Sequence, residues 1–201
     1  MKNKYCLIGV ITIILLLVLG GVIFFSTREK EESDALKFSK EYQTVGDDNV
    51  FVYRDASEII NILENGTGVV YLGFPECPWC QSYVAMLNDV ALEVGLEKIY
   101  YYNILNDRKD NTEEYQQMVA VLKDYLDKDD EGSERIFVPN VSFHVDGEII
   151  GNDNETSLDT GGFDDPDDYW TSDKEEALKD KLTTLMEQVK KESLVCTDCN
   201  K

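Results

Sequence analysis

The stretch VVYLGFPECPWC, residues 69–80, decides which fold this sequence is expected to adopt. Its first half, Val69–Phe74, is a near-continuous apolar run with the length of a buried parallel strand. Its second half holds Cys77 and Cys80 at the spacing Cys-x-x-Cys. The segment that follows, Gln81–Val94, places its apolar residues on one side of a helix. The two cysteines are therefore predicted to lie where a buried strand passes into a helix.

Strand-like and helix-like segments alternate on both sides of this stretch. The expected strands are Val50–Tyr53, Val69–Phe74, Lys98–Leu105, Val141–Val145 and Glu148–Ile150, the last two joined by the tight-turn dipeptide Asp146-Gly147. The expected helices are Glu58–Glu64 (capped by Asp55 or Ser57), Gln81–Val94 (ended by Gly95), Thr112–Asp127 and Asp173–Glu192 (capped by Ser172). Loops are expected over Lys128–Arg135 and Asn152–Trp170. The order β-α-β-α-β-α-β-β-α predicts a three-layer α/β fold with a central mixed sheet flanked by helices.

The first thirty residues differ in kind from the rest of the chain. Two lysines precede an unbroken apolar run, Tyr5–Phe25, which is long enough to cross a bilayer as a helix. The run exceeds the apolar region of a cleavable signal peptide, so residues 1–27 are expected to form a transmembrane signal anchor, with a cleaved signal as the alternative. Arg28 and Lys30 balance the leading lysines, and the charge count therefore leaves the orientation open. The short leading stub favours a single-pass protein of the cell membrane whose main domain faces outside the cytoplasm, where disulfides persist.

Composition divides the remaining chain. Residues 28–48 are polar and charged and are expected to form a stalk, residues 49–192 the main domain, and residues 193–201 a tail with a second Cys-x-x-Cys. The chain has 40 acidic and 19 basic residues, for a net charge of −21. Such a charge repels nucleic acid, and no nucleic-acid partner is expected.

A cysteine at the start of a helix has a physical reason to be reactive. Unpaired backbone N–H groups and the helix dipole stabilise an anion there, and they lower the pKa of a thiol such as Cys77. Pro78 fits the first helical turn, where no backbone donor is needed. Trp79 is expected to present an apolar, exposed surface beside the pair, with a half-buried aromatic at the start of the helix as the alternative. Cys80 is expected to be more shielded. Zinc sites use the same spacing, and a metal site is the alternative.

At this point the sequence resembles the thioredoxin superfamily. The resemblance rests on VVYLGFPECPWC and on VPNVSFHVDGEIIG at residues 138–151, and it covers roughly residues 49–192. Within the superfamily, the sequence looks most like the small membrane-anchored thioredoxin-like proteins of Gram-positive bacteria, including those described as bacteriocin transport accessory proteins. The resemblance implies that Cys77 is the nucleophile and Cys80 the resolving cysteine. It also implies that Pro139 follows a cis peptide bond and guides the substrate backbone.

Two departures from the family pattern bear on the chemistry. The family carries a buried aspartate in the strand before the motif, and this chain has Tyr71 at that position. Glu76, next to Cys77, is interpreted as an exposed, solvated residue and not as a substitute for that aspartate. The dipeptide between the cysteines is Pro-Trp instead of Gly-Pro. Because this dipeptide tunes the reduction potential, the sequence leaves open whether the protein oxidises or reduces its substrates.

Three further features of the sequence bear on function. Cys196 and Cys199 form a candidate second redox pair, with a local disulfide or an intermolecular metal site as alternatives. His144, the single histidine, is interpreted as structural, on the strand face opposite the main apolar set. The acidic run Asp164–Asp168 lacks the ligand spacing of a calcium loop and is interpreted as a solvated loop.

The sequence thus predicts a thiol–disulfide oxidoreductase that acts on exported proteins or peptides. It needs no cofactor beyond its own Cys77–Cys80 disulfide and no metal, and it exchanges electrons with an unidentified redox partner. The alternatives are an accessory or adaptor protein for peptide export and, third, a cysteine-based metal binder.

Overall fold

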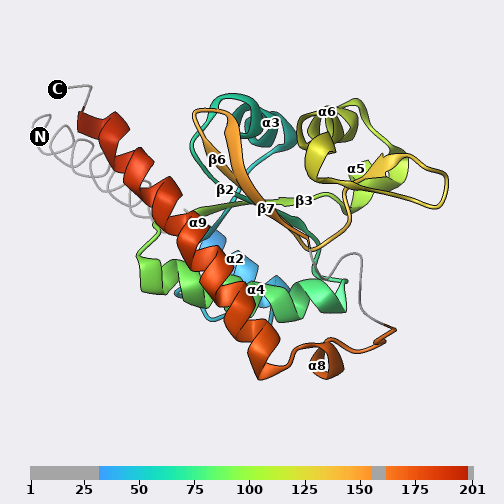
Figure 1. Ribbon diagram of the computed structural model, residues 1–201, viewed down its shortest axis with the longest axis horizontal. Coiled ribbons are helices and arrows are strands. Elements are labelled where there is room, and N and C mark those ends of the chain that lie inside the picture. The colour runs from blue at the N-terminus through green and yellow to red at the C-terminus, as the bar shows by residue number, and fades with distance from the viewer. Residues whose placement is uncertain (1–31, 155–161, 199–201) are drawn as a thin grey trace, which may run out of the picture. The chain divides into compact units, whose positions relative to one another are not determined.

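A five-stranded mixed sheet forms the centre of the computed structural model, which describes residues 32–154 and 162–198 (Figure 1). The strands are β1 (Phe51–Tyr53), β2 (Gly68–Gly73), β3 (Ile99–Asn103), β6 (Asn140–Val145) and β7 (Glu148–Asp153). Their order across the sheet is β1-β3-β2-β6-β7. β1, β3 and β2 run parallel, whereas β6 is antiparallel to both β2 and β7. The predicted α/β fold with a central mixed sheet flanked by helices is confirmed at this level.

Helices cover both faces of the sheet. In Figure 1, α3 (Ala56–Asn65) and α6 (Glu113–Leu122) lie above it, and α4 (Pro78–Val94) lies below it. The long helix α9 (Ser172–Asp198) packs against α4 and against β2 and β6. Two hydrophobic cores result, one on each face of the sheet.

The central strand β2 contributes to both cores because successive side chains of a strand point to opposite faces. Val69 and Tyr71 belong to the core under α4 and α9, and Val70 and Leu72 to the core under α3 and α6. Every residue of β2 is buried. A continuous apolar run is what a central strand covered on both faces requires.

Local signals in the sequence set the ends of these elements. Asp55 caps α3 through a capping box with Glu58, and Gly95 ends α4 in the left-handed conformation at φ 70°. The β6–β7 turn has positive φ at both Asp146 (50°) and Gly147 (80°), as a two-residue hairpin turn requires. These predicted caps and turn residues are confirmed.

The segment expected to be a stalk is part of the domain. Residues Asp34–Glu41 form helix α2, which packs on β1, and the compact unit begins at Asp34 rather than at residue 49. Phe38 on this helix and Tyr42 just after it are fully buried. Phe38 stacks on Phe51 at 3.9 Å between ring centroids. The placement of the domain boundary after this segment was therefore wrong, because two aromatic side chains fix it to the core.

The structure also contains elements that the sequence pattern did not predict. They are α5 (Leu105–Asp110), the 3-10 turn η1 (Lys123–Tyr125), the hairpin strands β4 (Asp127–Lys128) and β5 (Glu134–Arg135), and the short helix α8 (Pro166–Tyr169). Helix α6 ends at Leu122, before the predicted end at Asp127. Helix α9 begins at Ser172, which was expected to cap it, and continues to Asp198, six residues beyond the predicted end.

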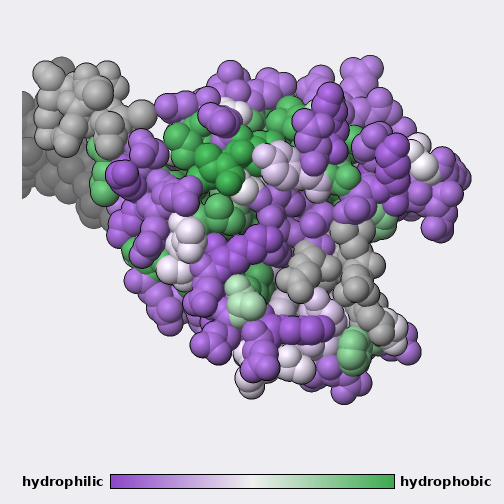
Figure 2. Space-filling view, viewed as in Figure 1, coloured by the Kyte–Doolittle hydropathy of each residue, from purple (hydrophilic) through white to green (hydrophobic). Residues whose placement is uncertain are grey.

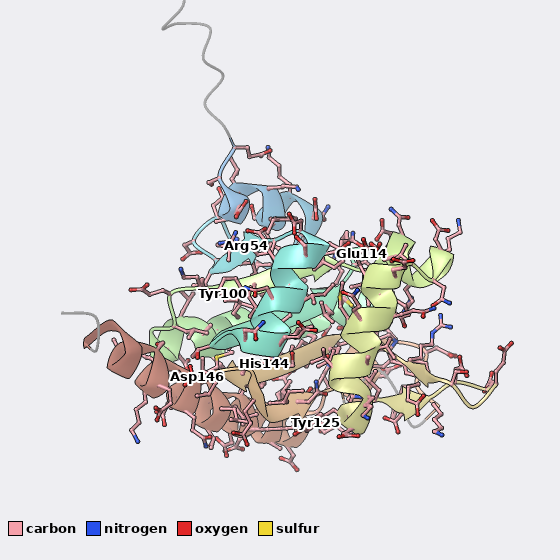
Figure 3. All side chains as sticks on the ribbon, turned by 90° about the horizontal axis from the view of Figure 1, so that it is seen from above. Arg54, Tyr100, Glu114, Tyr125, His144 and Asp146 are labelled. Atoms are coloured by element: carbon pink, nitrogen blue, oxygen red, sulfur yellow. The ribbon has the colours of Figure 1, made fainter. Side chains whose placement is uncertain are left out.

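The surface in this view is mostly hydrophilic, as the charged composition requires (Figure 2). An apolar area lies between α9 and α3, over the β6–β7 hairpin. Just after the edge strand β1, the guanidinium of Arg54 lies over the ring of Tyr100, with Cζ 5.5 Å from the centroid (Figure 3).

The predicted signal anchor, residues 1–27, lies outside the described residues. In residues 32–154 and 162–198, no helix has the length and apolar character to cross a membrane.

Candidate functional site

Cys77 and Cys80 lie at the junction that the sequence predicted, between the end of β2 and the start of α4. Cys77 is the N-cap residue of α4, and Pro78 occupies the first helical turn. The Sγ atom of Cys77 accepts a hydrogen bond from the backbone N–H of Cys80 at 3.4 Å. Both cysteines are free thiols. Cys77 is partly exposed and Cys80 is fully buried, so only the first can meet a large substrate.

The surroundings of Cys77 stabilise its thiolate. A hydrogen bond from the Cys80 thiol is the main cause that lowers the pKa of Cys77, to about 7, against the opposing effect of burial. The backbone N–H groups of Cys80 and Trp79 contribute, as does the positive charge of Arg108. A thiolate is the nucleophilic form of cysteine, so Cys77 is substantially reactive near neutral pH.

Cys80 has the opposite character. Burial is the main cause that raises its pKa well above the ordinary value, and its hydrogen bond to Cys77 and the charge there act in the same direction. The backbone N–H of Phe74 and the hydroxyl of Tyr71 oppose this rise in the pKa of Cys80, because both can stabilise its ionised sulfur as hydrogen-bond donors. The pair therefore consists of an accessible thiolate and a buried thiol, which is the asymmetry that a nucleophile and a resolving thiol need.

Arg108 is a member of the site that the sequence did not reveal. It lies on α5, with its guanidinium over the ring of Phe74 (Cζ 4.8 Å from the centroid) and Nη1 3.4 Å from the carbonyl oxygen of Ile136. Burial lowers the pKa of Arg108, although the negative charge of Cys77 raises it. The group nonetheless stays a cation at neutral pH. Nothing in the local pattern predicted α5, so no signal placed this arginine next to the cysteines.

Trp79 is half-buried rather than exposed, which corrects the prediction. Its ring packs edge-on against Tyr169 of α8, with centroids 5.4 Å apart. The amino group of Lys174 lies over the ring of Tyr169, 3.4 Å from its centroid. The prediction was wrong because it treated the segment containing Tyr169 as loop, whereas α8 folds back onto the start of α4.

A groove of about 610 Å³ adjoins Cys77 between the start of α4 and the α8 region. The residues on both sides of Cys77, Glu76 and Pro78, line it. Three more carboxylates share the lining: Asp165, Asp167 and Glu175. The surface next to the reactive thiolate is therefore strongly negative, and Glu76 is exposed, as predicted.

Pro139 lies beside the end of the strand that leads to the cysteines. Asn140 pairs with Leu72 across β6 and β2, which places Pro139 near the point where β2 ends. The Val138–Pro139 peptide bond is cis, as expected. Val138 packs against the same core as Cys77 and Trp79. The role of Pro139 as a guide for the substrate backbone stays a prediction.

The other candidate residues lie away from this site or outside the described part. Cys199 lies outside the described residues, and Cys196 falls within α9. His144 is fully buried on β6, near α3 in Figure 3, with Nε2 2.8 Å from Ser142 Oγ. Burial lowers the pKa of His144 to about 4, which fits the interpretation of a structural, neutral histidine.

In the acidic run Asp164–Asp168, Asp165 caps α8. Among the described residues, no three His, Cys, Asp or Glu side chains form a group that could hold a metal ion.

Comparisons of the chain with protein-family models, with curated proteins and with solved structures found no match. The fold and the site define an α/β protein with a dithiol at the start of a helix.

Proposed function

We propose that this protein is a thiol–disulfide oxidoreductase that exchanges disulfides with polypeptides through Cys77 and Cys80. The observation that carries the proposal is the unequal pair at the start of α4. Cys77 is partly exposed with a pKa lowered to about 7, and Cys80 is buried with a raised pKa. An accessible thiolate one helical turn from a shielded thiol suits an exchange in two steps.

In the reducing direction, the Cys77 thiolate attacks one sulfur of a substrate disulfide. A bond forms between Cys77 and that sulfur, and the second substrate sulfur leaves as a thiolate. Cys80 then loses its proton and attacks the Cys77 sulfur, which forms the Cys77–Cys80 disulfide and releases the first substrate sulfur as a thiolate. The substrate gains two electrons and the protein loses two. The reverse sequence oxidises a substrate dithiol, and a further redox partner resets the pair.

The finer fold assignment, a thioredoxin-like domain, is part of this proposal. It is supported by the alternation of strands and helices from β1 to α9, by the position of the cysteines after β2, and by Pro139 beside the end of that strand. Within this assignment Tyr71 replaces a buried acid, and the direction of electron flow is set by the reduction potential of the pair.

The proposed setting is the outer face of a cell membrane. The apolar run Tyr5–Phe25 would anchor the chain, and the domain would act on exported proteins or peptides. The net charge of −21 favours partners other than nucleic acid. Cys196 and Cys199 are proposed as a second pair that passes electrons to or from the first.

The proposal is tested by insulin reduction and by refolding of reduced ribonuclease, with the full-length chain. The variants Cys77→Ser and Cys80→Ser should abolish turnover in both assays, because each removes one sulfur of the cycle. A Cys196→Ser/Cys199→Ser variant is the matched control and should keep activity when a small dithiol or disulfide replaces the redox partner.

Retention of full activity by the Cys77→Ser/Cys80→Ser double variant would refute the enzyme proposal. If the Cys77→Ser/Cys80→Ser double variant has no turnover but still supports peptide export in cells, an adaptor role explains the protein better. If the reduced chain binds stoichiometric zinc through these cysteines, it is instead a metal binder.

A further inference from the structure

Three tyrosine hydroxyls lie together in the core beside the buried cysteine. Tyr71 comes from β2, Tyr101 from the neighbouring strand β3, and Tyr42 from the chain just after α2. All three side chains are fully buried. The Tyr71 hydroxyl lies 3.5 Å from that of Tyr42, which lies 3.3 Å from that of Tyr101. These distances exceed the usual 2.7–2.8 Å between hydroxyls, so the contacts within the cluster are weak.

Ring packing holds the cluster in place. Tyr71 and Tyr101 are stacked with centroids 5.5 Å apart, and Tyr42 meets both rings edge-on. Gly73 makes room for the hydroxyl of Tyr71, because a Cβ atom at this position would collide with it. The Tyr71 hydroxyl is thereby fixed in the same buried core as Cys80, whose sulfur is a second acceptor for its hydrogen.

The Tyr71 hydroxyl has one hydrogen and two neighbouring acceptors, Tyr42 Oη and Cys80 Sγ. A hydroxyl hydrogen rotates to the better acceptor. Hydrogen bonds to an ionised acceptor are roughly twice as strong as those between neutral groups. Loss of the Cys80 proton therefore draws the hydrogen away from Tyr42 and toward the sulfur.

We propose that Tyr71 is the hydrogen-bond donor that stabilises the Cys80 thiolate in the resolving step, and that Tyr42 and Tyr101 position it. The proposal rests on the proposed exchange function. In this step Cys80 loses its proton to solvent, and its sulfur attacks the sulfur of Cys77 in the mixed disulfide. The Cys77–Cys80 bond forms, the bond to the substrate sulfur breaks, and that sulfur leaves with the electron pair and takes up a proton from solvent.

Tyr71 acts only as a donor in this scheme. Burial raises its pKa well above the ordinary value, so the hydroxyl keeps its proton throughout the working range. It cannot be the base that removes the Cys80 proton. This distinguishes the arrangement from one in which a carboxylate accepts that proton, and it predicts an effect on the ionisation of Cys80 rather than a separate titration of Tyr71.

The test uses the full-length chain with Cys6, Cys196 and Cys199 replaced by Ser, here called the two-cysteine background. The reduced protein reacts at low pH with the aromatic disulfide dithiobis-nitrobenzoate, which leaves a mixed disulfide on Cys77. A jump to higher pH then starts resolution, and release of the second thionitrobenzoate is followed by absorbance. Repetition over a range of final pH gives the apparent pKa of Cys80.

In this assay Tyr71→Phe is expected to raise the apparent pKa of Cys80 by about one unit. Resolution should therefore slow about tenfold at any pH below both midpoints. Tyr42→Phe should shift the midpoint less than Tyr71→Phe, because it leaves the Tyr71 donor and the ring packing in place. The matched control is Tyr83→Phe, since the Tyr83 hydroxyl is equally buried but donates to Asp153 at 2.8 Å. This control should leave the midpoint unchanged.

An unchanged midpoint in Tyr71→Phe, with the two-cysteine background resolving normally, overturns the inference and leaves the proposed function intact. So does an equal shift in Tyr71→Phe and Tyr83→Phe, which would mark a general loss of packing. If the two-cysteine background itself never releases the second thionitrobenzoate, the proposed function fails instead.

Discussion

The thiol of Cys80 should set the reactivity of Cys77, and replacing it separates two of the contributions to that reactivity. Its hydrogen bond is the main cause that lowers the pKa of Cys77 to about 7, and the backbone N–H of Cys80 adds to it. The variant Cys80→Ala removes the side-chain donor and keeps the backbone donor. The variant Cys80→Ser keeps a donor at nearly the same place and is the matched control.

The size of the effect follows from the ionised fraction. Hydrogen bonds to charged groups contribute about 1.5–3 kcal/mol, or roughly one to two pKa units. A thiol with a pKa of about 7 is half ionised at neutral pH, and one with a pKa higher by about one unit is ionised to roughly a tenth. Cys80→Ala should therefore slow alkylation of Cys77 about fivefold at neutral pH, whereas Cys80→Ser should stay within about twofold.

The assay is the rate of reaction with iodoacetamide as a function of pH, with Cys6, Cys196 and Cys199 replaced by Ser and the product located by mass spectrometry. Both variants should reach the same plateau rate at high pH, because only the ionised fraction differs. Equal midpoints for Cys80→Ala and Cys80→Ser would show that the Cys80 side chain does not stabilise the Cys77 thiolate. A midpoint at the ordinary cysteine pKa in the protein that keeps both Cys77 and Cys80 would refute the account of the site as a whole.

Three other predictions concern the core, the buried histidine and the surface beside the site. Phe38→Ala should lower the free energy of unfolding by about 3–5 kcal/mol, while Leu36→Ala on the exposed side of the same helix should cost less than about 1 kcal/mol; equal costs in urea unfolding would contradict the assignment of α2 to the core. Burial lowers the pKa of His144 from 6.5 to about 4, so the unfolded chain binds a proton that the folded chain rejects, and stability falls as pH drops through this window. His144→Asn should lose less stability there, by at most about 3 kcal/mol, and parallel stability–pH curves would argue against a neutral buried histidine. The carboxylates around the groove should make Cys77 react faster with the cationic disulfide cystamine than with the anionic dithiodiglycolate, and the ratio should shrink as salt is added; a ratio that does not depend on salt would exclude this field as its cause.

The central part of the fold could be predicted because each signal there is local. Val69–Phe74 is apolar throughout, as a strand buried on both faces must be, and Asp55 and Gly95 mark helix ends by their own backbone chemistry. The Asp146-Gly147 turn is equally explicit. These features required no knowledge of distant parts of the chain.

The missed elements depend on tertiary contacts. Helix α2 is short and mostly polar, and the packing of Phe38 on Phe51 and of Tyr42 just after the helix explains its place in the core. Helix α5 has six residues and none of them is buried, so it carries no amphipathic pattern. Arg108 lies on α5, so the sequence did not reveal it as a member of the site. The two cysteines were placed correctly because the strand and helix on either side of them have clear patterns.

The surroundings of Tyr71 could not be predicted from the sequence. Its contact with the Cys80 sulfur, and the hydroxyls of Tyr42 and Tyr101 behind it, depend on three segments far apart in the sequence. Only the folded structure brings these segments together.

The reduction potential of the Cys77/Cys80 pair tests the central claim most directly. The full-length chain with Cys6, Cys196 and Cys199 replaced by Ser is equilibrated with mixtures of reduced and oxidised glutathione, quenched with acid and analysed by mass. The account predicts a reversible two-electron transition to a Cys77–Cys80 disulfide, with a potential between about −270 mV, typical of a reductant, and about −120 mV, typical of an oxidant. Failure to form that disulfide at any glutathione ratio would contradict the claim that these two cysteines are a redox pair.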